Sequence, residues 1–175
     1  MLAKWLVAAG VLMASTAGCG YSIKADSDYD ARVNFSNYGT FSMMKGNSSG
    51  DSLTDARLAS DVASALMSKG WAEVPEGEGQ AAVIIHIATD AEHTHETFSK
   101  RWSGWHWHWG GFNSPTKVVE DYKVGTLIVT IFDANTKHAI WRGFAADAIS
   151  DDPKQATKVR EAAVARIFDR FPRVR

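Results

Sequence analysis

Leu127-Ile128-Val129-Thr130-Ile131-Phe132 is the stretch that decides the fold, because its β-branched and aromatic residues are typical of a buried strand. Turn-forming residues follow it in Ala134-Asn135-Thr136-Lys137, and Ala139-Ile140-Trp141 resumes the extended pattern. The segments Val118–Asp133 and His138–Ile149 are therefore predicted to form a β-hairpin. This hairpin is the strongest structural signal in the chain.

Two helices are indicated by apolar residues that recur every fourth position. The first is expected to begin at Asp51 or Ser52 as its N-cap and to end at Gly70, which supplies a left-handed stop. The second has Asp152 as its cap and Pro153 in its first turn. The apolar stripes consist of Leu58, Val62 and Leu66 in the first helix and of Val159, Ala163 and Ile167 in the second.

Three further extended segments are predicted upstream of the hairpin. Val33–Met43 suggests a first strand with a turn near Asn37-Tyr38-Gly39, and Trp71–Val74 suggests a short extended piece. Ala82–Thr89 is almost continuously apolar, which indicates an interior strand covered on both faces. The order strand, helix, strand, hairpin, helix predicts a single α+β domain, with a mostly antiparallel sheet and two helices packed on it.

The N-terminus has the layout of an export signal over residues 1–18. Lys4 is the positive charge, Trp5–Met13 is the apolar region, and Thr16-Ala17-Gly18 leads with small residues to Cys19. This arrangement resembles the bacterial lipobox, in which a peptidase cuts before the cysteine and the thiol carries a diacylglycerol. Thr16 stands where lipoboxes usually have leucine, so plain secretion with cleavage nearby remains the alternative.

A lipidated Cys19 would hold the domain on a membrane surface. By resemblance to Gram-negative lipoproteins, the absence of aspartate at Gly20 favours the outer membrane, with the domain on the periplasmic face. Residues 19–32 are then a polar tether and residues 33–175 the domain. The tether's acidic residues lack the glycine and distal glutamate of an EF-hand, which indicates a solvated face. They are Asp26, Asp28 and Asp30.

Composition excludes several classes of function. The net charge of −1 provides no basic field, so nucleic acid is not an expected partner. A single cysteine rules out an internal disulfide. The sequence contains no Gly-x-Ser-x-Gly elbow, no His-Glu-x-x-His motif and no Walker loop, so we expect no enzymatic activity.

Several short segments carry a resemblance to a known family. They are Tyr29-Asp30, Phe35-Ser36-Asn37-Tyr38-Gly39-Thr40-Phe41, Gly70-Trp71, and above all Gly125-Thr126-Leu127 through Asp133 to Ile140-Trp141-Arg142-Gly143. The chain resembles, from about Tyr29 to Pro172, the bacterial lipoproteins catalogued as domain of unknown function 4136. The resemblance implies an exported, usually lipid-anchored α+β domain of the cell envelope. It implies no established activity and no site residues.

The chemically unusual part of the chain is His93–Phe112, which we call the His/Trp segment. It holds four of the six histidines and four of the seven tryptophans. In an extended backbone, residues two apart share a face, so the paired histidines would lie on one side and alternate tryptophans on the other. The histidines are His93, His95, His106 and His108, and the aromatic residues are Trp102, Trp105, Trp107, Trp109 and Phe112.

Three interpretations of the His/Trp segment remain open. The four imidazoles suit a zinc or copper ion if the two His-x-His motifs converge, with Glu92 or Glu96 as an added ligand or hydrogen-bond partner. The indoles suit a contact surface for the membrane headgroup layer, an envelope protein or a glycan. The third interpretation is that the tryptophans only extend the core.

We expect the contact surface, and therefore a lipid-anchored binding or assembly module of the outer membrane without a cofactor. The alternative is a periplasmic metal-binding protein. Elsewhere in the chain, His86 within an apolar strand is interpreted as a core histidine, and His138 beside the hairpin turn as an exposed one.

Overall fold

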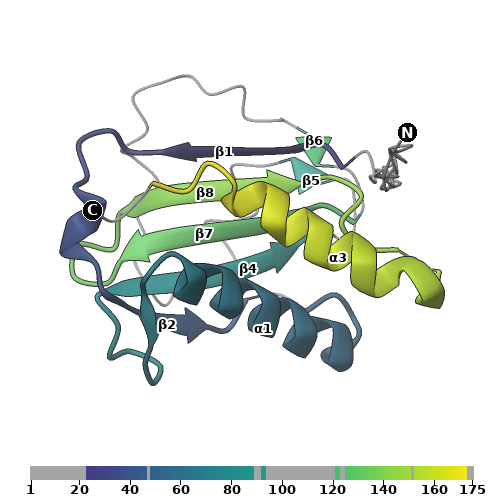
Figure 1. The fold of residues 1–175 in the computed structure, drawn as a ribbon, viewed down its shortest axis with the longest axis horizontal. Coiled ribbons are helices and arrows are strands. Elements are labelled where there is room, and N and C mark those ends of the chain that lie inside the picture. The colour runs from purple at the N-terminus through teal and green to yellow at the C-terminus, as the bar shows by residue number, and fades with distance from the viewer. Residues whose placement is uncertain are drawn as a thin grey trace, which may run out of the picture.

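The computed structural model describes residues 23–46, 48–88, 92–93, 121–122, 125–150 and 152–172. These residues form an open six-stranded sheet with two helices, α1 and α3, on one face (Figure 1). The strand order is β1-β8-β7-β4-β2-β3. The strands are β1 (Ala25–Tyr29), β2 (Thr40–Met44), β3 (Ala72–Glu73), β4 (Ala81–Ile87), β7 (Leu127–Asp133) and β8 (Ala139–Ala145). The helices are α1 (Ser52–Ser68) and α3 (Pro153–Phe168), and a 3-10 turn, η1, covers Phe35–Asn37.

The α+β class and the single domain are confirmed, but the prediction of a mostly antiparallel sheet was wrong. The sheet is mixed: β1, β8, β7 and β4 pair antiparallel, whereas β4, β2 and β3 pair parallel. The parallel pairs arise because β2 and β4 are joined through α1, and a strand that returns through a helix runs in the same direction.

The predicted helix boundaries agree with the structure. Asp51 is the N-cap of α1, and its carboxylate accepts from the backbone N–H groups of Leu53 and Thr54. Gly70 follows this helix with φ +95°, a conformation that glycine adopts without a steric penalty. Asp152 caps α3 by accepting from the N–H of Lys154. The predicted β7–β8 hairpin is also present, with a register irregularity between Ile131 and Phe132.

One segment assigned to the tether belongs to the sheet. Ala25–Tyr29 forms β1 and pairs along its whole length with β8, from Ala25 opposite Ala145 to Tyr29 opposite Trp141. The strand was missed because alternating aspartates look like a solvated loop, whereas Asp26 and Asp28 lie on a strand with only one neighbour among the described residues. The folded domain therefore begins before residue 33.

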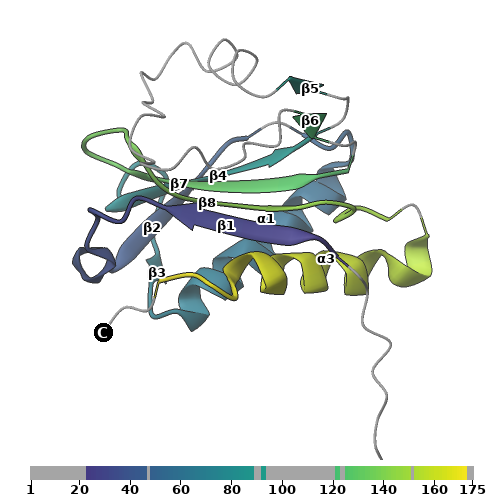
Figure 2. The ribbon, with the colours of Figure 1, turned by 90° about the horizontal axis from the view of Figure 1, so that it is seen from above.

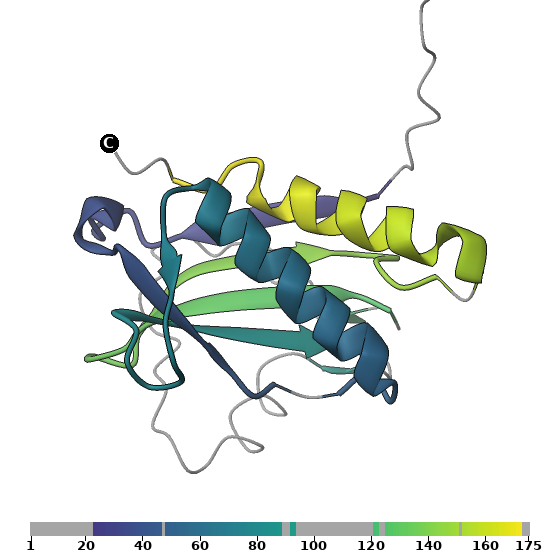
Figure 3. The same ribbon diagram turned by 60° about the horizontal axis from the view of Figure 1, so that its bottom comes forward.

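The main core lies between the sheet and the two helices (Figure 3). An aromatic cluster stabilises one end of it: Trp141 stacks on Phe168 with ring centroids 4.9 Å apart, and Phe171 meets Trp141 edge-on at 5.3 Å. Phe171 also contacts Trp71, which stacks on Tyr38 at 5.8 Å. These aromatic pairs join β8, α3 and the loop before β3 into one packed unit.

The opposite face of the sheet is also buried, in two smaller clusters. Ile84, Phe132 and Ala139 form one, and Ala88 with Ile128 forms the other. Figure 2 shows the short strands β5 (Glu92–His93) and β6 (Asp121–Tyr122) on this side, away from α1 and α3. No helix among the described residues is long and apolar enough to cross a membrane.

Candidate functional site

Most of the predicted site residues lie outside the part of the chain that the structure describes. These are the lipidation candidate Cys19, the histidines His95, His106 and His108, and the aromatic residues Trp102, Trp105, Trp107, Trp109 and Phe112. His93 is described in its backbone and belongs to β5. The structure therefore defines where the His/Trp segment is attached to the domain.

The segment is attached to the sheet by two neighbouring antiparallel strands. Ile87 at the end of β4 is directly opposite Leu127 at the start of β7. Beyond this pair, the N–H of Ala88 donates to the Thr126 carbonyl at 3.0 Å, and the N–H of Gly125 donates to the Ala88 carbonyl at 2.8 Å. The backbone thus leaves the sheet and returns to it through a hydrogen-bonded base.

A second ladder lies further along the same two arms of the chain. Glu92 is opposite Tyr122 and His93 is opposite Asp121 in the antiparallel β5–β6 pair. Directly opposed residues in such a ladder have Cα atoms about 4.5–5.5 Å apart. Residues 94–120, which hold the other three candidate histidines, therefore begin and end at one short ladder.

The β5–β6 ladder is relevant to the metal interpretation at one position, His93. His93 is the one predicted ligand whose backbone is described, and its register partner Asp121 carries a carboxylate that sequence spacing did not bring into the candidate set. The pairing of residues about thirty positions apart is a long-range property, which explains why Asp121 was missed. Among the described residues, no group of three or more histidine, cysteine or acidic side chains is placed to hold a metal ion.

The N-terminal end of the domain lies in line with this base. Ala25 at the start of β1 is opposite Ala145, Ala145 is opposite Leu127, and Leu127 is opposite Ile87. The chain entering β1 and the chain leaving for the His/Trp segment are consequently at the same end of the sheet. With strands about 4.8 Å apart, three strand spacings separate them by about 14 Å.

Polar side chains on the sheet face away from the helices form a row that the sequence analysis did not single out. Thr130 on β7 is opposite both Ile84 and Arg142, and Arg142 is in turn opposite Asp28 on β1. Thr130 is 1% exposed, and its hydroxyl has no hydrogen-bond partner among the described residues. His86 is buried on the same strand face as Ile84, in agreement with its interpretation as a core histidine.

The far end of the sheet is held by a different set of polar contacts. The hydroxyl of Tyr38 donates to Asp133 at 2.7 Å, and Asp133 also accepts from the backbone N–H groups of Asn135 and Thr136 in the hairpin turn. Burial favours a higher pKa for the Asp133 carboxyl, but the bonds from Thr136 and Tyr38 hold that pKa below its usual value. Burial and the Asp133 contact raise the pKa of Tyr38.

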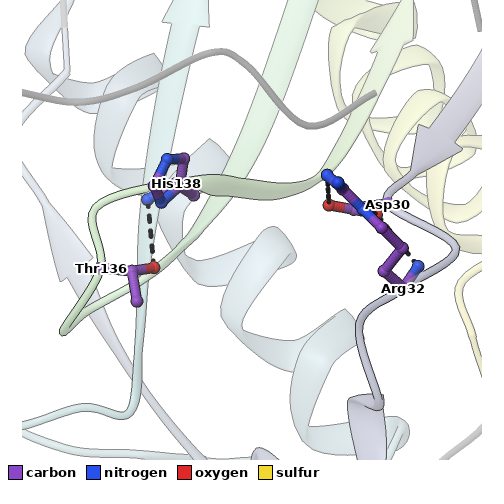
Figure 4. A network of polar contacts seen from close by, with 4 residues as sticks. All are labelled: Asp30, Arg32, Thr136 and His138. Carbon is purple, nitrogen blue, oxygen red and sulfur yellow. Dashed lines mark hydrogen bonds and ion pairs between the residues drawn. The ribbon is translucent and has the colours of Figure 1, made fainter. Parts of the chain in front are cut away.

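A carboxylate–guanidinium pair lies at this end as well (Figure 4). Arg32 donates to the two oxygens of Asp30 at 2.9 and 2.8 Å, and this bond lowers the pKa of the Asp30 carboxyl. The backbone N–H of exposed His138 donates to the hydroxyl of Thr136 at 3.4 Å. These contacts stabilise the turn and the end of β1, and they lie at the end of β4 and β7 opposite to the base of the His/Trp segment.

A hollow of about 440 Å³ lies between the two helices, lined by small and charged side chains such as Ser64, Ala65 and Glu161. Beside it, the Nε of Arg160 on α3 donates to Asp61 on α1 at 2.5 Å. The Arg160 side chain is 9% exposed, so this ion pair is largely removed from water. The contact ties the two helices together and places no further reactive group in the hollow.

A mixed sheet with two helices on one face and a long connection between two of its central strands defines the class, a small α+β domain. The connection is rich in histidine and tryptophan. The chain belongs to the family described as Domain of unknown function (DUF4136), whose model matches residues 25–173. The match begins at Ala25, the first residue of β1. No curated protein matches the chain in sequence.

The first two of the following solved structures share the fold at low sequence identity. A DUF4136 family protein from Bacteroides thetaiotaomicron is 13% identical, with a TM-score of 0.61, over 89% of this chain and 98% of that one. A PDZ domain protein from Parabacteroides distasonis is 10% identical, with a TM-score of 0.52, over 85% of this chain and 36% of that one. A dodecamer of a PelC variant from Paraburkholderia phytofirmans is 7% identical, with a TM-score of 0.48, over 83% of this chain and 93% of that one.

Proposed function

We propose that the protein is a lipid-anchored protein of the cell envelope that acts as a binding or assembly module through its His/Trp segment. The observation that carries the proposal is the alignment of Ala25, Ala145, Leu127 and Ile87 across the sheet. An anchor at Cys19 would therefore lead into the domain at the same end as the base of the His/Trp segment.

The stretch between Cys19 and Ala25 is short, so it would also limit how far the base of the His/Trp segment can lie from the membrane. Only a few residues separate Cys19 from Ala25, and each extended residue spans at most about 3.6 Å, so the tether reaches about 20 Å. The start of β1 would remain within that distance of the lipid headgroups. The base of the segment, about 14 Å from the start of β1 across the strands, would stay near the same surface.

The chemistry of the segment suits such a position. Indole side chains have an apolar ring and a polar N–H, and they favour the boundary between lipid and water. We therefore infer that Trp102, Trp105, Trp107, Trp109 and Phe112 contact the headgroup layer of the anchoring membrane. An envelope protein or a glycan strand held at that layer would use the same aromatic surface.

The test replaces Trp105, Trp107 and Trp109 together with serine in the unanchored Cys19→Ser chain, because a lipid anchor would hold every form on the vesicle. We expect the unfolding midpoint in urea to stay close to that of the unchanged chain, while binding to vesicles of outer-membrane lipids falls at least tenfold. The matched control replaces the same three residues with phenylalanine, which keeps an apolar ring. A collapse of stability in the serine variant would show that the tryptophans belong to the core and would contradict the proposal.

The second candidate function is metal binding, favoured by the register of His93 opposite Asp121 at the ladder that begins and ends residues 94–120. Imidazole nitrogens with one carboxylate are a ligand set that zinc accepts, and imidazole also suits copper. Replacement of His93, His95, His106 and His108 with alanine should abolish zinc or copper binding measured by calorimetry. Weak binding that is the same in the unchanged chain and in the variant would count against this function.

A further inference from the structure

The outer edge of β1 is the place where the six-stranded sheet ends on one side. Within the described part of the chain, β1 has β8 as its only neighbour. A strand with one neighbour presents a row of backbone N–H and C=O groups to which another strand can add. Tyr29 is 47% exposed and the Asp26 side chain 58% exposed, so this edge is accessible to solvent.

The register shows which backbone groups of β1 point outward. The carbonyl of Lys24 accepts from Ala146 of the β8 side at 2.9 Å, and the N–H of Asp30 donates to Ile140 of β8 at 3.0 Å. In an antiparallel pair such bonding residues alternate with residues whose backbone groups point away from the partner. Ser27 and Tyr29 therefore direct their N–H groups to the outer edge.

Both of these outward N–H groups already have an acceptor. The N–H of Ser27 donates to the Asp26 carboxylate at 2.8 Å, and the N–H of Tyr29 donates to the Asp28 carboxylate at 2.9 Å. Each aspartate thus accepts from the backbone N–H of the residue that follows it, so that this N–H is not available to an added strand. We propose that Asp26 and Asp28 close the edge of β1 against strand addition, and that the partner they exclude is a second copy of this chain.

The excluded partner is a second copy of this chain, because two β1 strands can pair antiparallel with each other about a two-fold axis. In such a pair, the Ser27 and Tyr29 N–H groups of each copy would have to donate to the other copy. The aspartates occupy the Ser27 and Tyr29 donors of both copies. They also place two carboxylates of each copy along the joint edge, where like charges destabilise pairing.

Aspartate suits positions 26 and 28 because its side chain can both accept the N–H of the next residue and place a negative charge at the strand edge. Asp26 lies 3.8 Å from Arg170 through exposed atoms, a contact of small energetic value. Asp28 is opposite Arg142 in the register. The hydrogen bonds from the N–H groups of Ser27 and Tyr29 direct the two carboxylates along the strand. The proposal concerns only β1 and is independent of the proposed function.

The experiment compares four forms of the full chain in the same detergent: unchanged, Asp26→Ala/Asp28→Ala, Asp26→Asn/Asp28→Asn, and Glu76→Ala/Glu78→Ala. Asparagine keeps an oxygen that can accept the same bond without the charge. The two glutamates are exposed in the turn before β4, so their replacement removes the same charge elsewhere. Sedimentation over a range of concentrations measures association, and amide hydrogen exchange in the monomer measures protection of Ser27 and Tyr29.

We expect the alanine variant to dimerise at concentrations where the other three forms remain monomers. In the monomer, its Ser27 and Tyr29 amides should exchange about tenfold faster, which corresponds to the loss of one hydrogen bond. An alanine variant that stays monomeric at every concentration would overturn the proposal. Equal dimerisation of the asparagine variant would overturn it as well, because charge alone would then keep the edge closed.

Discussion

Gly143 is the residue at which the packing of the sheet against α3 leaves no room for a side chain. A Cβ atom built there would lie 2.3 Å from Cγ2 of Ile167 and 2.6 Å from the ring of Trp141. Both neighbours are fully buried, and Trp141 is stacked on Phe168. The glycine is therefore required by the close approach of two large side chains, with no contribution from an unusual backbone conformation.

We predict that Gly143→Ala lowers the free energy of unfolding by about 1–3 kcal/mol, because overpacking displaces buried side chains. Urea unfolding followed by tryptophan fluorescence measures the change. Gly39→Ala is the control, since the nearest atom to its Cβ would be Oε1 of Gln80 at 3.7 Å. The control should be neutral or slightly stabilising, because alanine restricts the unfolded chain. Equal effects of both substitutions would contradict this account of Gly143.

Helices α1 and α3 are joined by an ion pair in addition to their apolar contacts. Arg160 on α3 is 9% exposed in its side chain and bonds to Asp61 on α1, which is 23% exposed. A guanidinium in such a position is stabilised mainly by its carboxylate partner. Removal of one partner leaves a poorly hydrated charge, whereas removal of both leaves none.

We predict that Asp61→Ala lowers the free energy of unfolding by about 1.5–3 kcal/mol, the range for hydrogen bonds to charged groups. Asp61→Ala/Arg160→Met should recover part of that loss, because methionine fills space without a charge. A double-mutant cycle in urea measures the coupling between the two side chains. Strictly additive effects of the two substitutions would show that the pair contributes nothing to the helix contact.

The elements that the sequence predicted correctly are those with local signals. Asp51 and Asp152 cap their helices, Gly70 ends the first one, and the β7–β8 hairpin has turn residues between two apolar runs. The sheet order had no such signal, because the parallel pairing of β2 with β4 depends on where α1 packs. β1 was missed because its composition is polar, and only its pairing with β8 makes it a strand.

The His/Trp segment could be singled out from its composition, but the position of its base on the sheet could not. The alternation of His and Trp residues identified the His/Trp segment from the sequence alone. Its base was not identified, because the pairings of Ile87 with Leu127 and of His93 with Asp121 join residues far apart in the chain. The same limitation hid the polar row of Thr130 and Arg142, which exists only when three strands lie side by side.

If Cys19 carries the proposed lipid anchor, the common end of β1, β4 and β7 sets an orientation of the domain on the membrane. The start of α3 lies at this same end, whereas the turn between β7 and β8 lies at the other (Figures 1 and 2). A seven-residue strand spans about 20 Å, so the two ends of the domain differ clearly in their distance from an anchoring bilayer. An anchor at Cys19 would place the start of α3 on the membrane side.

We predict that a fluorophore at Lys154→Cys, in the second residue of α3, is quenched by nitroxide lipids more strongly than one at Asn135→Cys in the hairpin turn. Both positions are exposed, so labelling should leave the fold unchanged. The measurement uses the lipidated chain in vesicles, with the unanchored Cys19→Ser chain carrying the same labels as the control. Equal quenching at the two positions would show that the domain has no fixed orientation.

The hydrogen-bonded base formed by Ala88, Thr126 and Gly125 also affects how far the sequence between β4 and β7 can vary. Because the two ends of the insertion are already held together, a longer or shorter stretch costs little: each doubling of loop length adds about 0.6 kcal/mol of closure entropy. The sheet can therefore accept a replacement sequence between β4 and β7 without a new strand register. The domain is suited to serve as a graft scaffold, in which one continuous stretch between β4 and β7 can be exchanged while the folded body is retained.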